Sequence, residues 1–273
     1  MLPHRALDPA FSTQLVRPSA VLGWLAIPLI VVVTLLVCFT PGGGRATGLG
    51  AAAALAAAPT KAPEPGPAPA AEPEPVDCRV QRCIALTFDD GPGPYTAQVL
   101  DDLREHGARA TFFVIGSKIS DGAILRRAVA EGHELGNHTF DHTRLVGLPA
   151  ARISEEFRRT DDAVRRATGE APTLVRPPFG VTGPLPNRIA DRPVILWDVD
   201  TRDWLTRSTA ATVRAAVAGA HPGAIILLHD IHPTSVAAVP AILTRLQERG
   251  FTLVTVSELL ADPRPGLVYR NAG

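Results

Sequence analysis

The sequence has no excess of charge of either sign. Lysine plus arginine and aspartate plus glutamate each total 27 among its 273 residues, so the formal net charge is +0. A neutral chain lacks the positive field that gathers nucleic acid. We therefore expect no nucleic-acid partner, and nothing in the sequence indicates a protein partner. The length, with 46% hydrophobic residues, suits one sizeable domain with appendages.

Cysteine is scarce, with three residues in the chain. Cys38 lies in an apolar segment, whereas Cys78 and Cys83 flank the start of the predicted folded region. No second cysteine pair is present to complete a zinc site with them. A disulfide formed in an oxidising compartment, or two free thiols, are therefore favoured over a partial metal site.

Charged side chains are missing from residues 18–44. Within this stretch lies VLGWLAIPLIVVVTLLVCF, which as a helix is roughly long enough to cross a hydrocarbon core of about 30 Å. Arg5 and Arg17 precede it, and the positive-inside rule then keeps residues 1–18 in the cytoplasm. We predict a single-pass membrane anchor at residues 19–39.

The same segment has a second interpretation as a cleaved secretory signal. The alanine-rich residues 51–58 offer small-residue cleavage sites, although the apolar run exceeds the usual length of about 7 to 15 residues. Residues 40–76 are dominated by Ala, Pro and Gly, which predicts a disordered, extended linker. In both interpretations residues 77–273 form the folded domain, held outside the cell by the anchor or secreted.

Short apolar runs alternate with amphipathic segments from residue 77 onward, which predicts an α/β fold with a parallel sheet, either open or rolled into a barrel. The expected strands are residues 84–88, 110–116, 134–140, 194–200, 224–230 and 251–256. The expected helices are residues 96–107, 123–132, 151–169, 209–220 and 237–250. In such barrels, functional groups gather at the carboxyl ends of the strands.

Ionisable side chains follow the ends of the expected strands. They are Asp89, Asp90, His138, His142, Asp198, Asp200, Asp203, His229 and Asp230. For an isolated Asp-Asp-Gly, a polar turn is the simplest explanation. In HTFDH, however, two histidines four residues apart are able to bind one ion, and one aspartate would complete a set of two imidazoles and a carboxylate. The other aspartate would then remain free to accept a proton from water.

Five motifs of the sequence, TFDDGP, HTFDH, RPPFG, DVDTRDW and LLH, occur in an order and at separations that resemble the polysaccharide deacetylases. This family is also called carbohydrate esterase family four or the NodB homology domain. The resemblance covers Cys83 to Val256. It implies a distorted (β/α) barrel of about seven parallel strands and metal-dependent hydrolysis of acetyl groups, usually N-acetyl groups on amino sugars. Zinc is the expected metal, with cobalt or another divalent ion as alternatives.

The resemblance also implies roles for single residues. Asp90, His138 and His142 would be the metal ligands, Asp89 the general base, and Arg176 the residue that holds this base in place. Without the resemblance, a surface arginine at a Pro-Pro turn would be the default interpretation of Arg176.

The remaining implied roles concern the leaving group and the acetyl group. His229 would be the general acid, and Asp203 would keep it charged and oriented. The backbone N–H of Phe179 would stabilise the oxyanion. Trp204 and Leu227 would wall the pocket for the acetyl methyl group, although Leu227 suits a core position equally well.

Two features depart from the family pattern. Phe179 stands where many relatives carry tyrosine, which matters little if only its backbone donor is used. Pro184 and Pro186 are expected to shorten or break a helix that often begins there, so the rim of the groove and the substrate preference are open.

These observations predict a membrane-anchored or secreted N-deacetylase acting on an extracellular polysaccharide. Peptidoglycan is the first expected substrate, chitin oligomers the second, and acetylated xylan, an ester substrate, the third. A non-catalytic wall-binding protein on the same fold is the competing interpretation, which the complete set of site residues disfavours.

Overall fold

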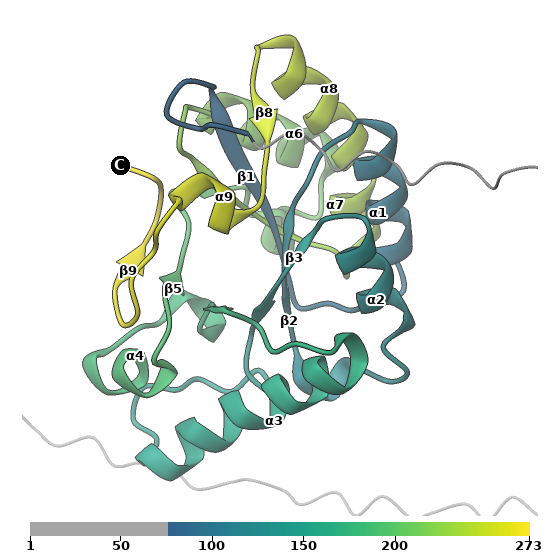
Figure 1. Cartoon of the computed structure of the whole chain (residues 1–273). Coiled ribbons are helices and arrows are strands. Elements are labelled where there is room, and N and C mark those ends of the chain that lie inside the picture. The colour runs from purple at the N-terminus through teal and green to yellow at the C-terminus, as the bar shows by residue number, and fades with distance from the viewer. Residues whose placement is uncertain (1–75) are drawn as a thin grey trace, which may run out of the picture. The chain divides into compact units, whose positions relative to one another are not determined.

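A computed structural model of the chain describes residues 76–273 (Figure 1). The predicted cytoplasmic segment, the anchor or signal at 19–39 and almost all of the linker lie outside the described residues. Within residues 76–273, no helix combines the length and hydrophobicity that a membrane crossing requires. The predicted anchor and export therefore stay predictions.

The described residues form one nine-stranded sheet in which all paired strands are parallel. The strand order is β6-β7-β1-β2-β3-β4-β5-β9, and β8 pairs with the start of β1. The strands are β1 Cys83–Asp89, β2 Thr111–Val114, β3 Glu134–Asn137, β4 Leu174–Val175, β5 Val194–Ile195, β6 Val199–Asp200, β7 Ile225–His229, β8 Thr252–Leu253 and β9 Val268–Tyr269.

The sheet curls into a barrel-like shape because β5 and β6 belong to one short segment. β5 pairs with β4 and β9 near one end of the ladder, whereas β6 pairs with β7 at the other end. Only residues 196–198 separate them, and an extended chain spans about 3.5 Å per residue. The predicted barrel-like α/β fold is confirmed, but the single strand expected at 194–200 is divided by this bend.

Helices surround the sheet, with α1, α2 and α8 along one side and α3 at the bottom of the view in Figure 1. The helices are α1 Thr96–Glu105, α2 Ala123–Ala130, α3 Ala150–Thr168, α4 Pro184–Ala190, α5 Asp203–Thr206, α6 Thr209–Gly219, α7 Pro233–Val236, α8 Val239–Glu248 and α9 Val256–Leu260, with 3₁₀ turns η1 Gly116–Lys118 and η2 Pro178–Gly180. Pro184 begins α4 at its first position, where a missing N–H does no harm. Pro186 lies in the same first turn, so the two prolines do not break this seven-residue helix, and the expected shortening stays a prediction.

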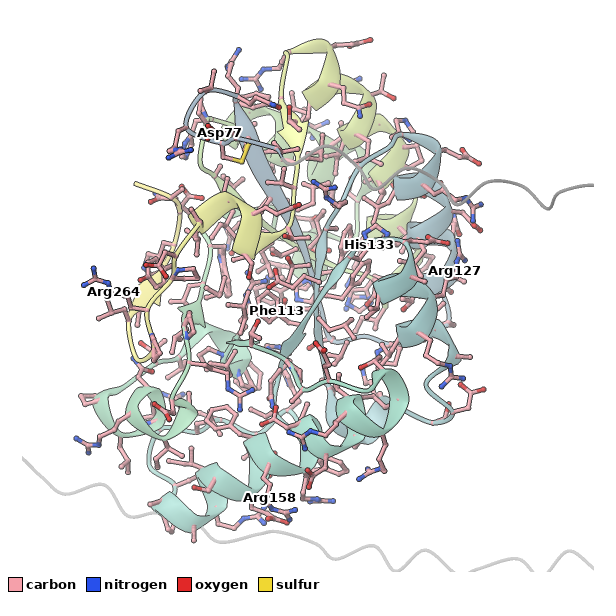
Figure 2. The ribbon with its side chains drawn as sticks, in the orientation of Figure 1. Asp77, Phe113, Arg127, His133, Arg158 and Arg264 are labelled. Carbon is pink, nitrogen blue, oxygen red and sulfur yellow. A yellow bond between two sulfur atoms is a disulfide. The ribbon has the colours of Figure 1, made fainter. Side chains whose placement is uncertain are left out.

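The core has two sides because successive side chains of β1 point to opposite faces. Ile84, Leu86 and Phe88 pack against the helices, whereas Ala85 belongs to a second cluster around Phe113, which lies near the middle of Figure 2. Gly136 on β3 makes room for this ring, since a Cβ there would lie 2.2 Å from Phe113 Cδ1. The Phe113 ring thus fills the interior of the sheet beside β3.

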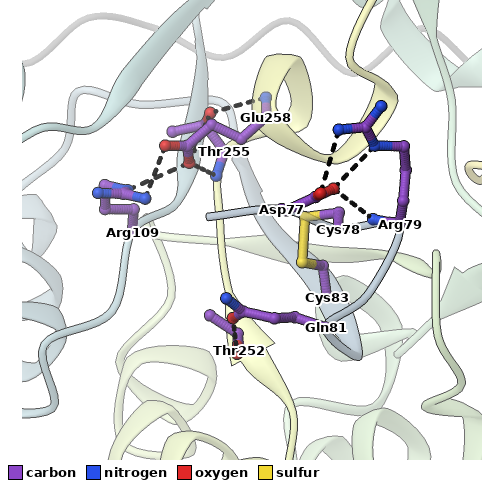
Figure 3. Close-up of a disulfide and its surroundings, with 9 residues drawn as sticks. All are labelled: Asp77, Cys78, Arg79, Gln81, Cys83, Arg109, Thr252, Thr255 and Glu258. Carbon is purple, nitrogen blue, oxygen red and sulfur yellow. Dashed lines mark hydrogen bonds and ion pairs between the residues drawn. A yellow bond between two sulfur atoms is a disulfide. The ribbon is translucent and has the colours of Figure 1, made fainter. Parts of the chain in front are cut away.

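Cys78 and Cys83 form a disulfide that ties the entry of the domain to β1 (Figure 3). This pairing decides among the alternatives that the sequence left open for the two cysteines. Nearby, Glu258 accepts the Thr255 N–H at 2.8 Å and pairs with Arg109 at 2.6 Å, which anchors the start of α9 (Figure 3). These contacts stabilise the end of the sheet away from the carboxyl end of β1.

His133, labelled in Figure 2, is a buried histidine outside the predicted site. Its Nδ1 accepts the Ala110 N–H at 3.3 Å, and its ring meets Phe112 edge-on. Burial lowers the pKa of His133 from 6.5 to about 4, and Arg127 and Arg109 add to this effect. Between these values the unfolded chain binds more protons than the folded chain, so the protein loses stability as pH falls from about 6.5 to 4.

We expect His133→Asn to reduce this pH dependence, because the asparagine oxygen is able to accept the Ala110 N–H without titrating. The shift corresponds to about 3 kcal/mol of unfolding free energy, at about 1.4 kcal/mol per pH unit. Urea unfolding of the full-length chain at pH 4 to 7 measures the effect. The variant will be less stable near pH 7 through lost packing, but its curve should be flatter. Parallel curves for the two proteins would contradict the prediction.

Candidate metal centre and active site

The carboxyl end of β1 delivers two neighbouring aspartates into one cavity. Because side chains alternate along a strand, adjacent residues share a side only where the backbone turns. Asp90 makes this turn with φ of 72°, a left-handed conformation that aspartate tolerates better than most residues. Asp89 and Asp90 both line the cavity as a result.

Asp90, His138 and His142 form a cluster of three convergent ligand atoms. Asp90 Oδ1 lies 3.4 Å from His138 Nε2 and 3.2 Å from His142 Nε2. Among the described residues this oxygen is buried without a hydrogen-bond partner. Two imidazole nitrogens and one carboxylate oxygen within 4.8 Å of one another are a donor set that suits zinc and related divalent ions. The cluster therefore fits the metal that the sequence predicts.

The second ring nitrogen of His138 sets its tautomer. Nδ1 lies 2.7 Å from the carbonyl oxygen of Arg176, to which it donates its proton. The lone pair of Nε2 then faces Asp90, as in histidine ligands whose other nitrogen is held by an acceptor. His142 reaches the same point from a left-handed residue, with φ of 54°, and its ring meets Phe179 edge-on.

The pKa shifts of Asp90 and His142 favour metal binding at neutral pH. Burial works against ionisation of Asp90, but the two imidazoles outweigh it and hold the pKa of Asp90 well below its usual range. Burial, together with the nearby His138, lowers the pKa of His142. A carboxylate and a neutral imidazole are the forms that bind metals.

Arg176 holds Asp89 from inside the barrel. Its Nη1 donates to Asp89 Oδ1 at 2.7 Å and to Thr87 Oγ1 at 2.8 Å, while the rest of the guanidinium donates to the carbonyls of Ile195 and Leu196. The guanidinium is fully buried, 4.1 Å above the centre of the Phe113 ring. With Oδ1 engaged, Asp89 Oδ2 is the oxygen that faces the metal cluster, 3.7 Å from His138 Nε2.

His229 stands opposite Asp89 on the neighbouring strand, since the β1–β7 register pairs these two residues. Its Nδ1 lies 2.9 Å from Asp203 Oδ1, and its backbone N–H donates to Asp203 Oδ2 at 2.9 Å. Burial disfavours the charged imidazole, but the buried Asp203 outweighs it and raises the pKa of His229. The contact also holds the pKa of Asp203 below its usual value despite its burial.

The cavity has a volume of about 440 Å³. Its lining comprises Asp89, Asp90, His138, His142, Phe179, Trp197, Asp200, Trp204, Leu227 and His229. Leu227 is 2% exposed and lies at the base of the cavity, whereas Phe179 and Trp204 are 63% and 45% exposed at its rim. Arg176 and Asp203 stand behind the lining, so the structure brings together all ten residues that the sequence predicts.

Comparisons with known proteins agree with this geometry. The family described as polysaccharide deacetylase matches residues 77–191. A solved structure, a T48 deacetylase with substrate, is 47% identical with a TM-score of 0.70, covering 71% of this chain and 99% of that chain. The chain belongs to the polysaccharide deacetylase family.

Two curated relatives place this polysaccharide deacetylase domain among proteins with named substrates. The peptidoglycan-N-acetylglucosamine deacetylase PgdA of Listeria monocytogenes is 39% identical over 186 residues, which are 67% of this chain. The match spans only 40% of the Listeria protein. The chitooligosaccharide deacetylase of Bradyrhizobium sp. is 36% identical over 198 residues, 65% of this chain and 90% of the relative.

The lining of the cavity includes two residues that have no role in the sequence prediction and leaves out two acids that follow expected strands. Asp200 followed an expected strand but received no role, and Trp197 gave no signal because it lies in the bend between β5 and β6. Asp198 is absent from the cavity lining; it accepts the Ile225 N–H at 3.0 Å and pairs with His221.

Asp230 also follows a strand end without reaching the cavity lining. It is fully buried against Gly91, where a Cβ would lie 2.7 Å from its carboxylate oxygens, and burial raises the pKa of Asp230 to about 6. The position of a charge after a strand therefore did not by itself identify the site.

We expect the full-length chain to bind one divalent ion per molecule, and His142→Ala to lower its zinc affinity by more than about 100-fold. Loss of a direct ligand should exceed the roughly 10- to 100-fold effect of losing an outer partner. Competition with a chromogenic chelator measures the affinity. Asp141→Asn, in the same loop but outside the cluster, is the matched control. Wild-type affinity in His142→Ala would show that the cluster is not the metal site.

Proposed function

We propose that this chain is a metal-dependent hydrolase that removes acetyl groups from N-acetylated sugars of an extracellular polysaccharide. One observation carries the proposal: Asp89 and His229 lie side by side on neighbouring strands and line the same cavity as the cluster of Asp90, His138 and His142. An amide needs an activated nucleophile, a polarised carbonyl and a proton for its nitrogen. The arrangement offers a group for each need.

Asp90, His138 and His142 would hold the metal, with zinc as the first candidate. A divalent ion at such a site supplies Lewis-acid chemistry, polarising a carbonyl group and lowering the pKa of water. Asp89 accepts the proton of the attacking water at Oδ2, because Arg176 occupies Oδ1. The new carbon–oxygen bond forms on the acetyl carbon.

His229 delivers the second proton. Its Nδ1 is held by Asp203, so Nε2 is the nitrogen that gives its proton to the leaving amine as the carbon–nitrogen bond breaks. Phe179, in the left-handed region with φ of 63°, borders the cavity where its backbone N–H would stabilise the oxyanion. Leu227 and the exposed ring of Trp204 would enclose the acetyl methyl group.

Peptidoglycan is the substrate we propose first, since the Listeria relative is named for it, and chitin oligomers the second, since the Bradyrhizobium relative is named for them. An extracellular location, with a membrane anchor at residues 19–39, would place the domain near such a polymer. This part of the proposal rests on the apolar segment of the sequence alone.

Acetate release tests the activity directly. We expect the full-length chain, purified in mild detergent because of its apolar segment, to release acetate from peptidoglycan and from chitin oligomers only when supplied with metal. Asp89→Asn should lower the rate by about 10²- to 10⁴-fold, the usual contribution of a general base. Asp141→Asn, an exposed acid of the HTFDH motif, should retain activity. Metal-independent release, or full activity in Asp89→Asn, would refute the proposed roles.

Asp203→Asn tests the proposed acid through the pH dependence of kcat. Asp203 raises the pKa of His229, so His229 stays protonated to higher pH in the wild-type chain. The asparagine keeps the shape but removes the charge, and its single oxygen is able to accept only one of the two His229 N–H groups that Asp203 holds. The alkaline limb of the pH profile should therefore move to lower pH. An unmoved alkaline limb would mean that His229 is not the acid.

A further inference from the structure

The loop of residues 138–142 carries two of the three proposed metal ligands in an unfavourable backbone conformation. Thr139 has φ of 66° and His142 has φ of 54°. The left-handed region is uncommon for residues other than glycine, and for a β-branched residue such as threonine it is a genuine outlier. Residues in such conformations persist only where the surroundings hold them.

Side chains from β3 and α3 hold three consecutive backbone N–H groups of this loop. Asn137 Oδ1 accepts the Thr139 N–H at 2.8 Å. Glu156 Oε2 accepts the N–H groups of Phe140 and Asp141, each at 3.0 Å. The side-chain oxygens of Asn137 and Glu156 thus hold the part of the loop that lies between its two histidines.

Glu156 is an unusual residue for its position. It is fully buried on the face of α3 that otherwise presents Ile153, Phe157 and Val164 to the interior. Burying an acidic side chain is costly unless it is hydrogen-bonded. Its other oxygen, Oε1, faces the half-exposed Arg152 at 3.2 Å, so the inner contacts of Glu156 go to the loop.

Asn137 links the same loop to α3 from the other side. Its Nδ2 donates to the carbonyl of Phe157 at 2.9 Å and to Asp161 Oδ1 at 2.7 Å. The orientation of the side-chain amide is therefore set by two acceptors, which leaves Oδ1 for Thr139. Glu156 lies on α3, and the side chain of Asn137 on β3 is oriented by its contacts with α3. One helix therefore positions both side chains that hold the loop.

We propose that Glu156, together with Asn137, is a positioning residue of the metal centre. It holds residues 138–142 so that Nε2 of His138 and Nε2 of His142 converge on Asp90 before the metal binds. The inference rests on the metal-binding part of the proposed function and not on the deacetylation step.

Three variants of the full-length chain test this role. Glu156→Leu keeps the volume but removes both acceptors, and we expect zinc affinity to fall about 10- to 100-fold, as for outer partners of metal ligands. Glu156→Gln should stay within about threefold of the wild type, because its amide oxygen is able to replace Oε2. Arg152→Gln, which removes only the outer contact, is the matched control.

Hydrogen exchange of the metal-free proteins gives a readout independent of metal loading. Exchange at Phe140 and Asp141 should be faster in Glu156→Leu than in the wild type, Glu156→Gln and Arg152→Gln. If Glu156→Leu does not fold, Glu156→Asp replaces it, because aspartate keeps the charge but withdraws the acceptor by one methylene. It should then show the same losses in a folded protein.

Wild-type zinc affinity in Glu156→Leu or its replacement, or an equal loss in Glu156→Gln, would overturn this inference alone. A wild-type chain that binds no zinc would overturn the proposed metal site, and this inference with it. The two failures are therefore distinguishable.

Discussion

The buried ion pair between Arg176 and Asp89 is the interaction on which the rest of the site depends. A fully buried guanidinium is stable only when its donors are satisfied, and here the acceptors come from β1, β5 and the bend after β5. Breaking such a pair by removing one partner typically costs about 3 to 5 kcal/mol. The end of β5 and the bend after it supply the two carbonyls for this arrangement, those of Ile195 and Leu196.

The same residue also connects the proposed base to the metal cluster. The backbone N–H of Arg176 donates to the backbone carbonyl of Asn137, and the backbone carbonyl of Arg176 accepts a hydrogen bond from His138 Nδ1. One residue thus orients Asp89 through its side chain and His138 through its backbone. Arg176 directly follows β4, so the orientations of the proposed base and of a proposed ligand both depend on this one position.

Electrostatic pairing separates the two proposed proton-transfer groups. Asp89 lies beside a buried cation, whereas His229 lies beside a buried anion, Asp203. The first contact holds Asp89 Oδ1 in a hydrogen bond, and the second raises the pKa of His229. The two groups on paired strands thus have partners of opposite charge, which suits the opposite tasks proposed for them.

Much of the site was readable in the sequence because it lies where regular strands end. Alternating apolar and amphipathic segments indicated the parallel sheet, and five short motifs pointed to ten candidate site residues that the structure brings together. The bend that divides residues 194–200, and with it Trp197 in the cavity wall, was not readable, because pairing with β4 on one side and β7 on the other arises only when the sheet curls. The same holds for Glu156, which in the sequence is one more acid in a charged helix. Its burial against residues 138–142 depends on how α3 packs, and long-range packing leaves no local pattern in the residues that take part in it.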